Sequence, residues 1–290
     1  MLIVWIAFSS AGQALASMPD VLSAASLHAN YTSLGERLLH NQFQRALTLN
    51  SSEYSNELKG DAYALVDYPF STVSAALNRP EQWCDVLILH LNTKYCHATT
   101  NELRTVLMVS IGKKTTQPIE DAYPIEFSYL LAAATPNYLE IRLDADKGPL
   151  STRDYRIRLA AIPVEGGRTF VHLTYSYAYG LAGRLAMKTY LATIGRDKVG
   201  FTITGTQSDG QPEYIGGMRG VVERNTMRYY LAIDSYLGAV TAPPRYRLEK
   251  RLQNWFAATE KYPRQLHELG KAEYFNIKRS EYLRQQQSPD

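Results

Sequence analysis

An alternating hairpin near the middle of the chain constrains the fold more than any other segment. Apolar and polar residues alternate from Thr152 to Val164 and again from Thr169 to Tyr179, with Gly166-Gly167 between the two runs. A period of two is typical of strands that bury one face, and a Gly-Gly pair favours a tight turn. One face of the second run carries Val171, Leu173, Tyr175, Tyr177 and Tyr179. The pattern predicts an antiparallel sheet with a wide aromatic surface on one side.

The segments around this hairpin predict the rest of the fold. An extended stretch from Asp61 to Asp67 leads into a short amphipathic helix, which is interrupted near Pro80 and resumes to Leu87. Further strand signals cover Leu91 to Cys96, Leu103 to Ile111, Ile125 to Ala133 and Tyr138 to Asp144. After Gly180 the apolar spacing becomes helical, and one face carries Met187, Tyr190, Leu191, Ile194 and Phe201. We therefore expect an α+β fold in which a curved antiparallel sheet grips this long helix.

The chain divides into four predicted parts. Residues 1–16 are read as a signal peptide, 17–57 as a helical lead-in, 58–204 as the sheet-and-helix domain, and 205–290 as a C-terminal helical extension. Within the lead-in, the helix is expected to end at Asn50-Ser-Ser52. The extension contains a second amphipathic helix with the stripe Val222, Thr226, Tyr229, Tyr230, Ile233 and Leu237. With 290 residues, 45% of them hydrophobic, the chain is long enough for one large core or two small ones.

The first residues predict export. An apolar run from Leu2 to Phe8 is followed by small and polar residues and by Ala14-Leu15-Ala16, which matches the Ala-x-Ala cleavage pattern. The run is shorter than the roughly 20 residues that a membrane-spanning helix needs. A basic n-region is missing, so the alternative is a buried N-terminal helix. If the signal is used, the protein is periplasmic or secreted.

The two cysteines, Cys84 and Cys96, fit an oxidising compartment. With Cys84 in a helix and Cys96 in the next strand, a disulfide would close a loop of about a dozen residues and contribute on the order of 3 kcal/mol. Two buried free thiols are the alternative. A tetrahedral zinc site would need His90 and His97 from the same short segment, so we predict a disulfide and no metal site.

The mild net charge of +3 is unevenly distributed. From Arg245 onward ten basic residues face six acidic ones, and such a segment can contact an anionic membrane surface. The basic residues are interleaved with Glu260, Glu268, Glu273 and Glu281, which is also typical of a solvated helical face. We predict no nucleic-acid partner.

Catalytic and nucleotide-binding signatures are incomplete. The chain has no Gly-x-Ser-x-Gly run, and His267-Glu268 lacks the second histidine of a zincin. The run from Gly112 to Thr115 resembles the end of a phosphate loop, but Leu107 stands where the first glycine is needed. The sequence thus predicts no cofactor and favours binding over catalysis.

Two polar residues of the hairpin are candidates for a site. Arg153 shares strand parity with Tyr155 and Ile157, so an inward face would carry its guanidinium into a cavity. There it would need an acidic partner or an anionic ligand head group. The alternative is an ion pair at the sheet edge with Glu140, Asp144 or Asp146. His172 can act as a general base or polar anchor, or it is a satisfied strand residue.

The order of elements from Gly60 to Phe201 resembles the START and polyketide-cyclase-like superfamily, also called SRPBCC, which has the helix-grip fold. The resemblance rests on the stretch from Gly60 to Pro69, on the helix from Ser71 to Leu77 with Trp83 beyond it, and on the hairpin that runs into a helix at Arg184. It implies a pocket for a sterol, phospholipid or polyketide. By position, its lining would include Tyr155, Ile157, Tyr175, Tyr177, Met187, Tyr190 and Ile194.

Three functions follow from these observations. The first is an exported protein that binds or shuttles a hydrophobic ligand, such as a lipid, sterol or isoprenoid, in an apolar cavity. The 21 tyrosines would supply apolar faces with hydroxyls for a head group. The second is a cyclase- or hydrolase-type enzyme in which His172, Asp154 and Arg153 converge. The third is an envelope interaction protein with a closed core and an exposed stripe containing Trp255 and Phe256.

Overall fold

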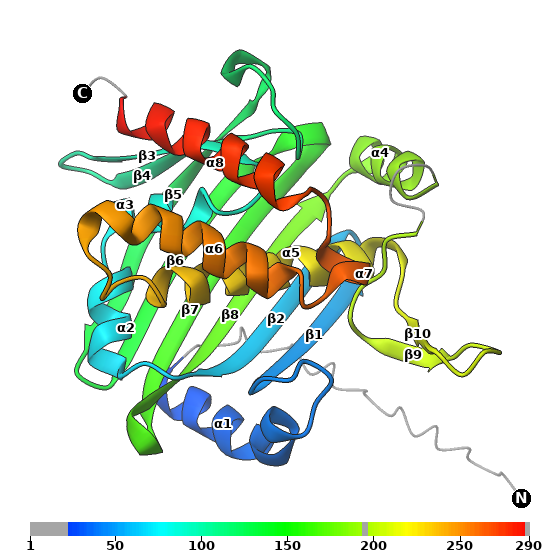
Figure 1. Ribbon diagram of the computed structural model, residues 1–290, viewed down its shortest axis with the longest axis horizontal. Coiled ribbons are helices and arrows are strands. Elements are labelled where there is room, and N and C mark those ends of the chain that lie inside the picture. Colours follow the sequence, from blue (N-terminus) through cyan, green and yellow to red (C-terminus); the bar gives the residue numbers. More distant parts are fainter. Residues whose placement is uncertain (1–22, 193–196, 288–290) are drawn as a thin grey trace, which may run out of the picture.

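The computed structural model describes residues 23–192 and 197–287, which form an α+β structure around one large sheet (Figure 1). Within these residues, the eight antiparallel strands of this sheet follow the order β1-β2-β8-β7-β6-β5-β4-β3, and β9 and β10 form a separate hairpin. The strands are β1 (Leu47–Tyr54), β2 (Glu57–Val66), β3 (Thr93–Thr100), β4 (Thr105–Ile111), β5 (Tyr123–Thr135), β6 (Tyr138–Lys147), β7 (Thr152–Val164), β8 (Arg168–Tyr179), β9 (Ile203–Thr206) and β10 (Pro212–Tyr214). The α-helices are α1 (Ala24–Leu39), α2 (Phe70–Leu77), α3 (Pro80–Leu87), α4 (Leu181–Ala192), α5 (Gly217–Leu237), α6 (Arg247–Thr259), α7 (Pro263–Leu266) and α8 (Lys271–Gln286).

The predicted hairpin is strands β7 and β8, and its alternation sets the two faces of the sheet. Ile157 pairs with Tyr175 and Leu159 with Leu173, and all four side chains are buried on the face that carries the main core. Residues of opposite parity, including Ala160 and Phe170, belong to a separate cluster with Leu27, Leu34 and Leu38 of α1. The sheet is therefore buried on both sides, and α1 covers the face opposite the main core.

The helix gripped by the sheet is α5. It packs against β1, β2 and β8, and α6 packs against it in turn. Figure 1 shows α5 (yellow) across the strands and α4 at the end of β8. The prediction that the segment after Gly180 forms the gripped helix was wrong, because α4 exposes Leu181 and Leu185, and α5 is the helix that packs across β1, β2 and β8. The α+β helix-grip fold itself is confirmed.

Close approach and buried hydrogen bonds hold α5 on the sheet. A Cβ atom at Gly60 of β2 would overlap Thr226 of α5, so only glycine lets the helix cross the strand at this distance. One turn earlier, the buried Glu223 carboxylate accepts hydrogen bonds from Ser51 Oγ (2.6 Å) and from the backbone N–H groups of Phe201 (2.6 Å) and Thr202 (2.9 Å). These contacts fix the N-terminal half of α5 against β1.

The main core joins parts that the sequence analysis separated. Met227 and Ile233 of α5 share one cluster with Leu173 of β8, so the predicted division between residues 204 and 205 runs through a common core. The lead-in predicted for residues 17–57 contains helix α1, but it also contains strand β1 at the sheet edge. The Asn50-Ser-Ser52 cluster lies inside β1, where it pairs with β2, and does not end a helix.

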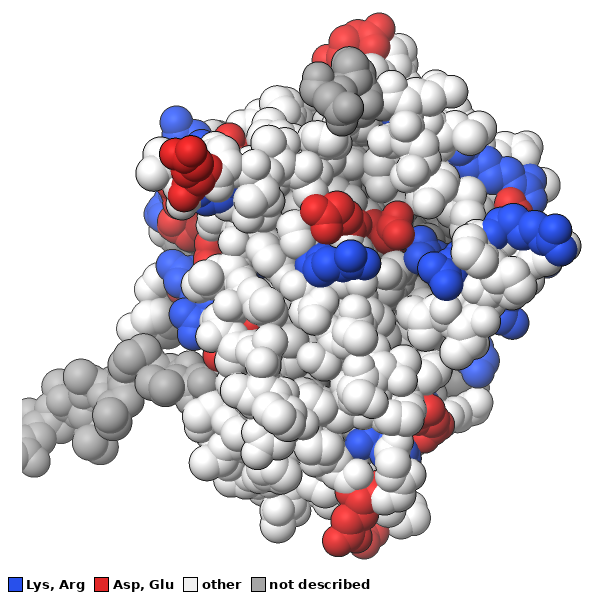
Figure 2. Space-filling view, turned by 90° about the vertical axis from the view of Figure 1, so that its left-hand side faces the viewer, with Lys and Arg blue, Asp and Glu red and all other residues white. Residues whose placement is uncertain are grey.

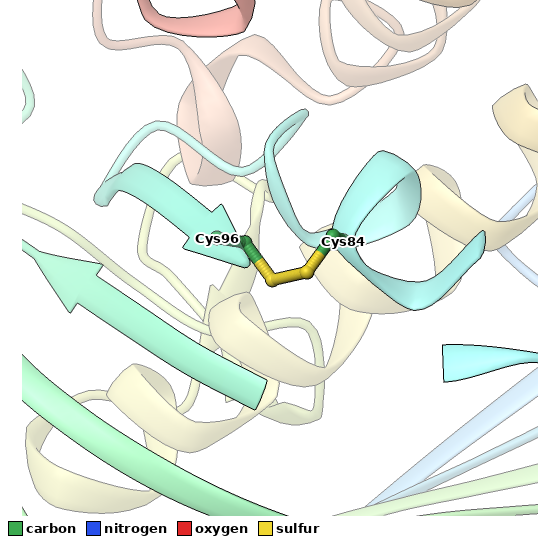
Figure 3. Close-up of a disulfide and its surroundings, with 2 residues drawn as sticks. All are labelled: Cys84 and Cys96. Atoms are coloured by element: carbon green, nitrogen blue, oxygen red, sulfur yellow. A yellow bond between two sulfur atoms is a disulfide. The ribbon is translucent and has the colours of Figure 1, made fainter. Parts of the chain in front are cut away.

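The predicted disulfide is present. Cys84 of α3 and Cys96 of β3 are bonded, with their Cα atoms 5.1 Å apart (Figure 3). Both residues are buried in the main core. The bridge ties the helix pair α2–α3 to the edge of the sheet, as the spacing of the two cysteines predicts.

The C-terminal helices are bound to the core by buried aromatic and charged groups. Trp255 of α6 is buried and stacks on Tyr274 of α8, with ring centroids 4.8 Å apart. Glu281 of α8 accepts hydrogen bonds from Lys94 Nζ of β3 (2.9 Å) and Lys278 Nζ (2.7 Å), and all three side chains are buried. The exposed stripe expected for an interaction protein is therefore wrong for Trp255.

The surface in Figure 2 has its acidic and basic side chains interspersed, and uncharged residues cover most of this face. Two of the basic residues in the segment that begins at Arg245 are buried and paired: Arg251 with Asp85, and Lys278 with Glu281. None of the described helices combines the length and the apolar character that crossing a bilayer requires. The predicted signal peptide lies outside the described residues.

Candidate ligand-binding cavity

A cavity of ≈ 350 Å³ lies between α5 and the sheet. Strands β4, β5, β7 and β8 form one wall, α5 and the segment after α3 form another, and α4 contributes to the rim. Its volume falls within the range of about 300–1,000 Å³ that is typical of small-molecule sites. The lining residues include Val109, Ile125, Phe127, Tyr155, Ile157, Tyr175, Tyr177, Met187, Val221 and Tyr229 on the apolar side.

Aromatic rings form a continuous surface on the strand wall. Tyr155 of β7 stacks on Tyr177 of β8 with centroids 5.2 Å apart, and Tyr175 lies 5.6 Å from Tyr177. Tyr175 also contacts Tyr229 of α5 at 5.1 Å, which closes the surface between sheet and helix. Burial raises the pKa of Tyr175 well above its ordinary value, with a smaller contribution from Tyr155. These rings thus present neutral, apolar faces.

A second part of the lining is cationic. Arg224 and Arg228 are one turn apart on α5, both are buried, and both line the cavity together with Lys114. Glu268, in the loop before α8, accepts hydrogen bonds from Lys114 Nζ (2.5 Å) and Arg228 Nη2 (2.7 Å). Arg224 Nη1 donates to the carbonyl of Val199 at 3.1 Å. Helix α5 thus brings two guanidinium groups to the cavity.

The pKa values of Lys114 and His90, which both line the cavity, are shifted from their ordinary values. Burial, followed by the positive charge of Arg228, lowers the pKa of Lys114 to about 8, although Glu268 acts in the opposite direction. The pKa of His90 is lowered well below its ordinary value, mainly by burial and then by Arg228 and Lys278. His90 is therefore neutral at pH 7. Burial is the main cause of both shifts, and the neighbouring cations add to it.

The protonated nitrogen of His90 can be identified from its contacts. Its Nδ1 atom accepts a hydrogen bond from the backbone N–H of Asn92 at 3.1 Å, so in the neutral ring the proton is on Nε2. Within the described residues, neither His90 Nε2 nor the Thr93 hydroxyl has a hydrogen-bond partner. Both groups are buried, and both residues line the cavity. The cavity thus offers a neutral N–H donor and a hydroxyl beside the three cations.

The structure brings together five of the eight residues predicted for the site. Tyr155, Ile157, Tyr175, Tyr177 and Met187 line the cavity. The side chain of Tyr190 and the whole of Ile194 lie outside the described part of the structure. Arg153 is 54% exposed and pairs with Asp154, so its predicted place in the cavity was wrong.

A β-bulge explains the position of Arg153. Strand β7 pairs regularly except between Arg153 and Arg156, where one extra residue is inserted opposite β8, and Asp154 there has a φ of 53°. An inserted residue reverses the side-chain parity of the strand beyond it. Arg153 therefore pairs with Ala178 and does not share a face with Tyr155 and Ile157.

The residues proposed for catalysis do not converge. His172 is buried on the face covered by α1, where its Nε2 lies 2.8 Å from Asp61 Oδ1 and its ring stacks on Tyr63. Asp154 and Arg153 are paired with each other near the strand end and do not line the cavity. The arrangement predicted for the enzyme was therefore wrong. Among the described residues, no three His, Cys, Asp or Glu side chains are grouped to hold a metal ion.

Sequence reasoning missed the cationic part of the site. Lys114 lines the cavity and belongs to the Gly112–Thr115 run. Because the phosphate-loop pattern of that run is incomplete, Lys114 was not predicted as a site residue. On α5 the cavity side carries Val221, Arg224, Asn225, Arg228 and Tyr229, and of these the predicted stripe included Tyr229 alone. The available signal was that Arg224, Asn225 and Arg228 share one side of the helix, but such a polar stripe usually marks a solvated face.

Comparisons with known proteins find only low similarity. No protein-family model matches the chain, and no curated protein matches it in sequence. Among solved structures, norcoclaurine synthase from Thalictrum flavum is 12% identical with a TM-score of 0.34, covering 50% of this chain and 89% of that one. Human StAR-related lipid transfer protein 5 is 8% identical with a TM-score of 0.33, covering 59% and 91%.

A conserved protein of unknown function from Enterococcus faecalis is 7% identical with a TM-score of 0.33, covering 82% of this chain and 92% of that one. All three TM-scores lie below 0.5, so these alignments add nothing to the argument about the site. The fold class rests on the strand order and the gripped helix. By these features the chain has the helix-grip fold that the resemblance implied.

Proposed function

We propose that this protein binds or shuttles a hydrophobic ligand in the cavity between α5 and the sheet. The observation that carries the proposal is the aromatic wall of Tyr155, Tyr175 and Tyr177, which faces a cavity of ≈ 350 Å³. When a ligand covers the apolar surface of such a cavity, it removes that surface from water, and this favours binding. Ile157 and Met187 add to the apolar lining.

The place of action in this proposal is outside the cytoplasm. Two independent features support export: the apolar run with Ala14-Leu15-Ala16 at the start of the chain, and the Cys84–Cys96 disulfide. N-terminal sequencing of the protein from its own host should give a mature chain that begins at Ser17. A chain from the same host that retains Met1 would contradict export through this signal.

Contact with a membrane surface is a further part of the proposal. The exposed basic residues of the C-terminal segment include Arg245, Lys250, Lys261, Arg264 and Lys271. Electrostatic attraction of such residues to anionic lipid would bring a carrier to the surface from which it takes its ligand. Vesicle sedimentation should therefore show salt-sensitive binding to phosphatidylglycerol vesicles and less binding to phosphatidylcholine vesicles. Equal binding to both would contradict this contact.

Native mass spectrometry with lipid extraction tests the binding function. Protein purified from its own host's envelope should carry a lipid or isoprenoid at close to one molecule per chain. Met187→Trp places a large ring at the cavity rim and should reduce this occupancy severalfold. Leu185→Trp is the matched control, because Leu185 is on the same helix but exposed and outside the lining. Empty wild-type protein would contradict the proposal.

A further inference from the structure

The polar part of the cavity specifies the chemistry of the ligand's head group. Lys114, Arg224 and Arg228 all line the cavity, and none of the described lining residues is an aspartate or glutamate. Building on the proposed function, we infer that the ligand is an amphipathic anion, with a carboxylate or phosphate group held by these three cations. Its apolar part then lies against the tyrosine wall.

The local ion pairs favour an additional anion. Glu268 is shared by Lys114 (2.5 Å), Arg228 (2.7 Å) and Lys198 (3.5 Å), so one carboxylate interacts with three cations. Arg228 is 2% exposed, and a buried guanidinium is stabilised by acceptors that can approach it in its plane. A ligand carboxylate or phosphate supplies further negative charge and oxygen acceptors on the cavity side of this cluster.

Neutral donors beside the cations support the same head group. His90 is 3% exposed and Thr93 is 1% exposed, and their Nε2–H and hydroxyl groups have no partner within the described structure. A buried donor without an acceptor costs about 1–3 kcal/mol, so such groups are expected to be satisfied when the site is occupied. A head-group oxygen can accept from both. A cationic or purely apolar ligand cannot satisfy these donors.

The polar and aromatic parts of the lining are in contact with each other. His90 stacks on Tyr229 at 4.9 Å, and Tyr229 in turn contacts Tyr175 at 5.1 Å. The polar groups are thus adjacent to the aromatic surface and continuous with it. This arrangement fits an anionic group attached directly to a hydrocarbon chain or ring system, either as a free fatty acid or as a phosphate ester.

Isothermal titration calorimetry with ligands of one chain length tests the inference. Dodecanoate, dodecyl phosphate and dodecanol differ in head group but share the hydrocarbon chain. The two anions are used below their critical micelle concentrations and dodecanol below its solubility limit. We expect at least one of the two anions to bind about tenfold or more tightly than dodecanol, since hydrogen bonds to charged groups are among the stronger ones. Their ranking separates a carboxylate from a phosphate ester. Inorganic phosphate, titrated alone, tests whether the head group suffices.

A pair of variants locates the effect. Lys114→Gln should weaken binding of the preferred anion about tenfold and leave dodecanol unchanged. Lys113→Gln is the matched control, because Lys113 is next to Lys114 in the sequence but is exposed and does not line the cavity. It should leave both affinities unchanged. If Lys114→Gln does not fold, the head-group series on the wild-type protein still decides the question.

The outcomes separate this inference from the proposed function. Equal binding of dodecanol and both anions would overturn the anionic head group while supporting a hydrophobic carrier. Binding of inorganic phosphate as tight as that of dodecyl phosphate would overturn the amphipathic ligand. If no ligand of the series binds, while native mass spectrometry finds a neutral lipid in the protein, the anionic inference fails alone. An empty protein that binds none of them contradicts both.

Discussion

Helices α4 and α5 show opposite relations between composition and burial. Helix α4 has good helix formers and apolar residues, yet its Leu181 and Leu185 are exposed by 85% and 68%. Helix α5 carries Glu223, Arg224 and Arg228 in its middle, yet all three are at most 2% exposed. A helix with charged residues on several sides is normally solvated. Burial of charge in α5 thus points to specific partners, and for its cavity side to a ligand.

The largest expected difference between the two helices is in packing. Met227 of α5 is completely buried, whereas Leu185 of α4 is exposed. Met227→Ala should lower the free energy of unfolding by about 2–5 kcal/mol because it leaves a cavity in the core. Leu185→Ala should change it by less than about 0.5 kcal/mol. Chemical denaturation measures both, and similar losses would show that α4 is packed as tightly as α5.

A smaller effect is expected where α5 crosses β2. Gly60→Ala should cost about 1–3 kcal/mol of unfolding free energy, because the new methyl group overlaps Thr226. Adding Thr226→Ala to the same chain should recover part of the loss. Gly180→Ala, just before α4, is the control, since its Cβ would meet only the Ser151 carbonyl oxygen at 3.8 Å. Thermal unfolding that ranks Gly180→Ala below Gly60→Ala in stability would contradict this crossing.

The smallest expected effect is the pH dependence of anion binding. Lys114, whose pKa is about 8 mainly through burial and Arg228, also faces Arg224 and Glu268. Because its folded pKa is lowered, Lys114 loses its proton as the pH rises through about 8. The affinity for dodecanoate, a carboxylate that stays ionised, should therefore fall roughly tenfold between about pH 7 and pH 9.

The control for this pH dependence is Lys114→Gln, which removes the titrating group. Its dodecanoate affinity should fall less over the same range, since His90 is already neutral at pH 7. Lys278, which also has a pKa of about 8, does not line the cavity and donates to the backbone carbonyls of His90 and Thr93. Calorimetry at three pH values is sufficient. A wild-type affinity that is constant or rises with pH would show that the charge of Lys114 does not contribute to binding.

The sequence predicted the strand wall of the site well, for a simple reason. A strand in regular pairing places every second residue on one face, so Tyr175 and Tyr177 were expected together and they are. The same rule failed at Arg153, where the bulge beside Asp154 changed the parity. A bulge depends on the pairing with the neighbouring strand, and this pairing is not visible in the alternation of β7 alone.

The helix wall was harder to predict because tertiary contacts decide it. Hydrophobic spacing after Gly180 suggested the gripped helix, but Leu181 and Leu185 of α4 are exposed, and α5 packs across β1, β2 and β8 instead. The features that place α5 are Gly60 on another element and the hydrogen bonds of Glu223, which no local pattern reveals. Likewise, Lys114 and His90 reach the cavity from two loops that are distant in sequence from α5.

Photo-crosslinking with a diazirine-tagged fatty acid, followed by peptide mass spectrometry, tests the central claim most directly. The claim is that the ligand lies between α5 and the tyrosine wall, and not on the exposed leucines of α4. We expect adducts on peptides that contain Tyr175, Tyr177 and Tyr229, with competition by excess dodecanoate. Adducts confined to Leu181 and Leu185, with none on α5 or β8, would contradict the account.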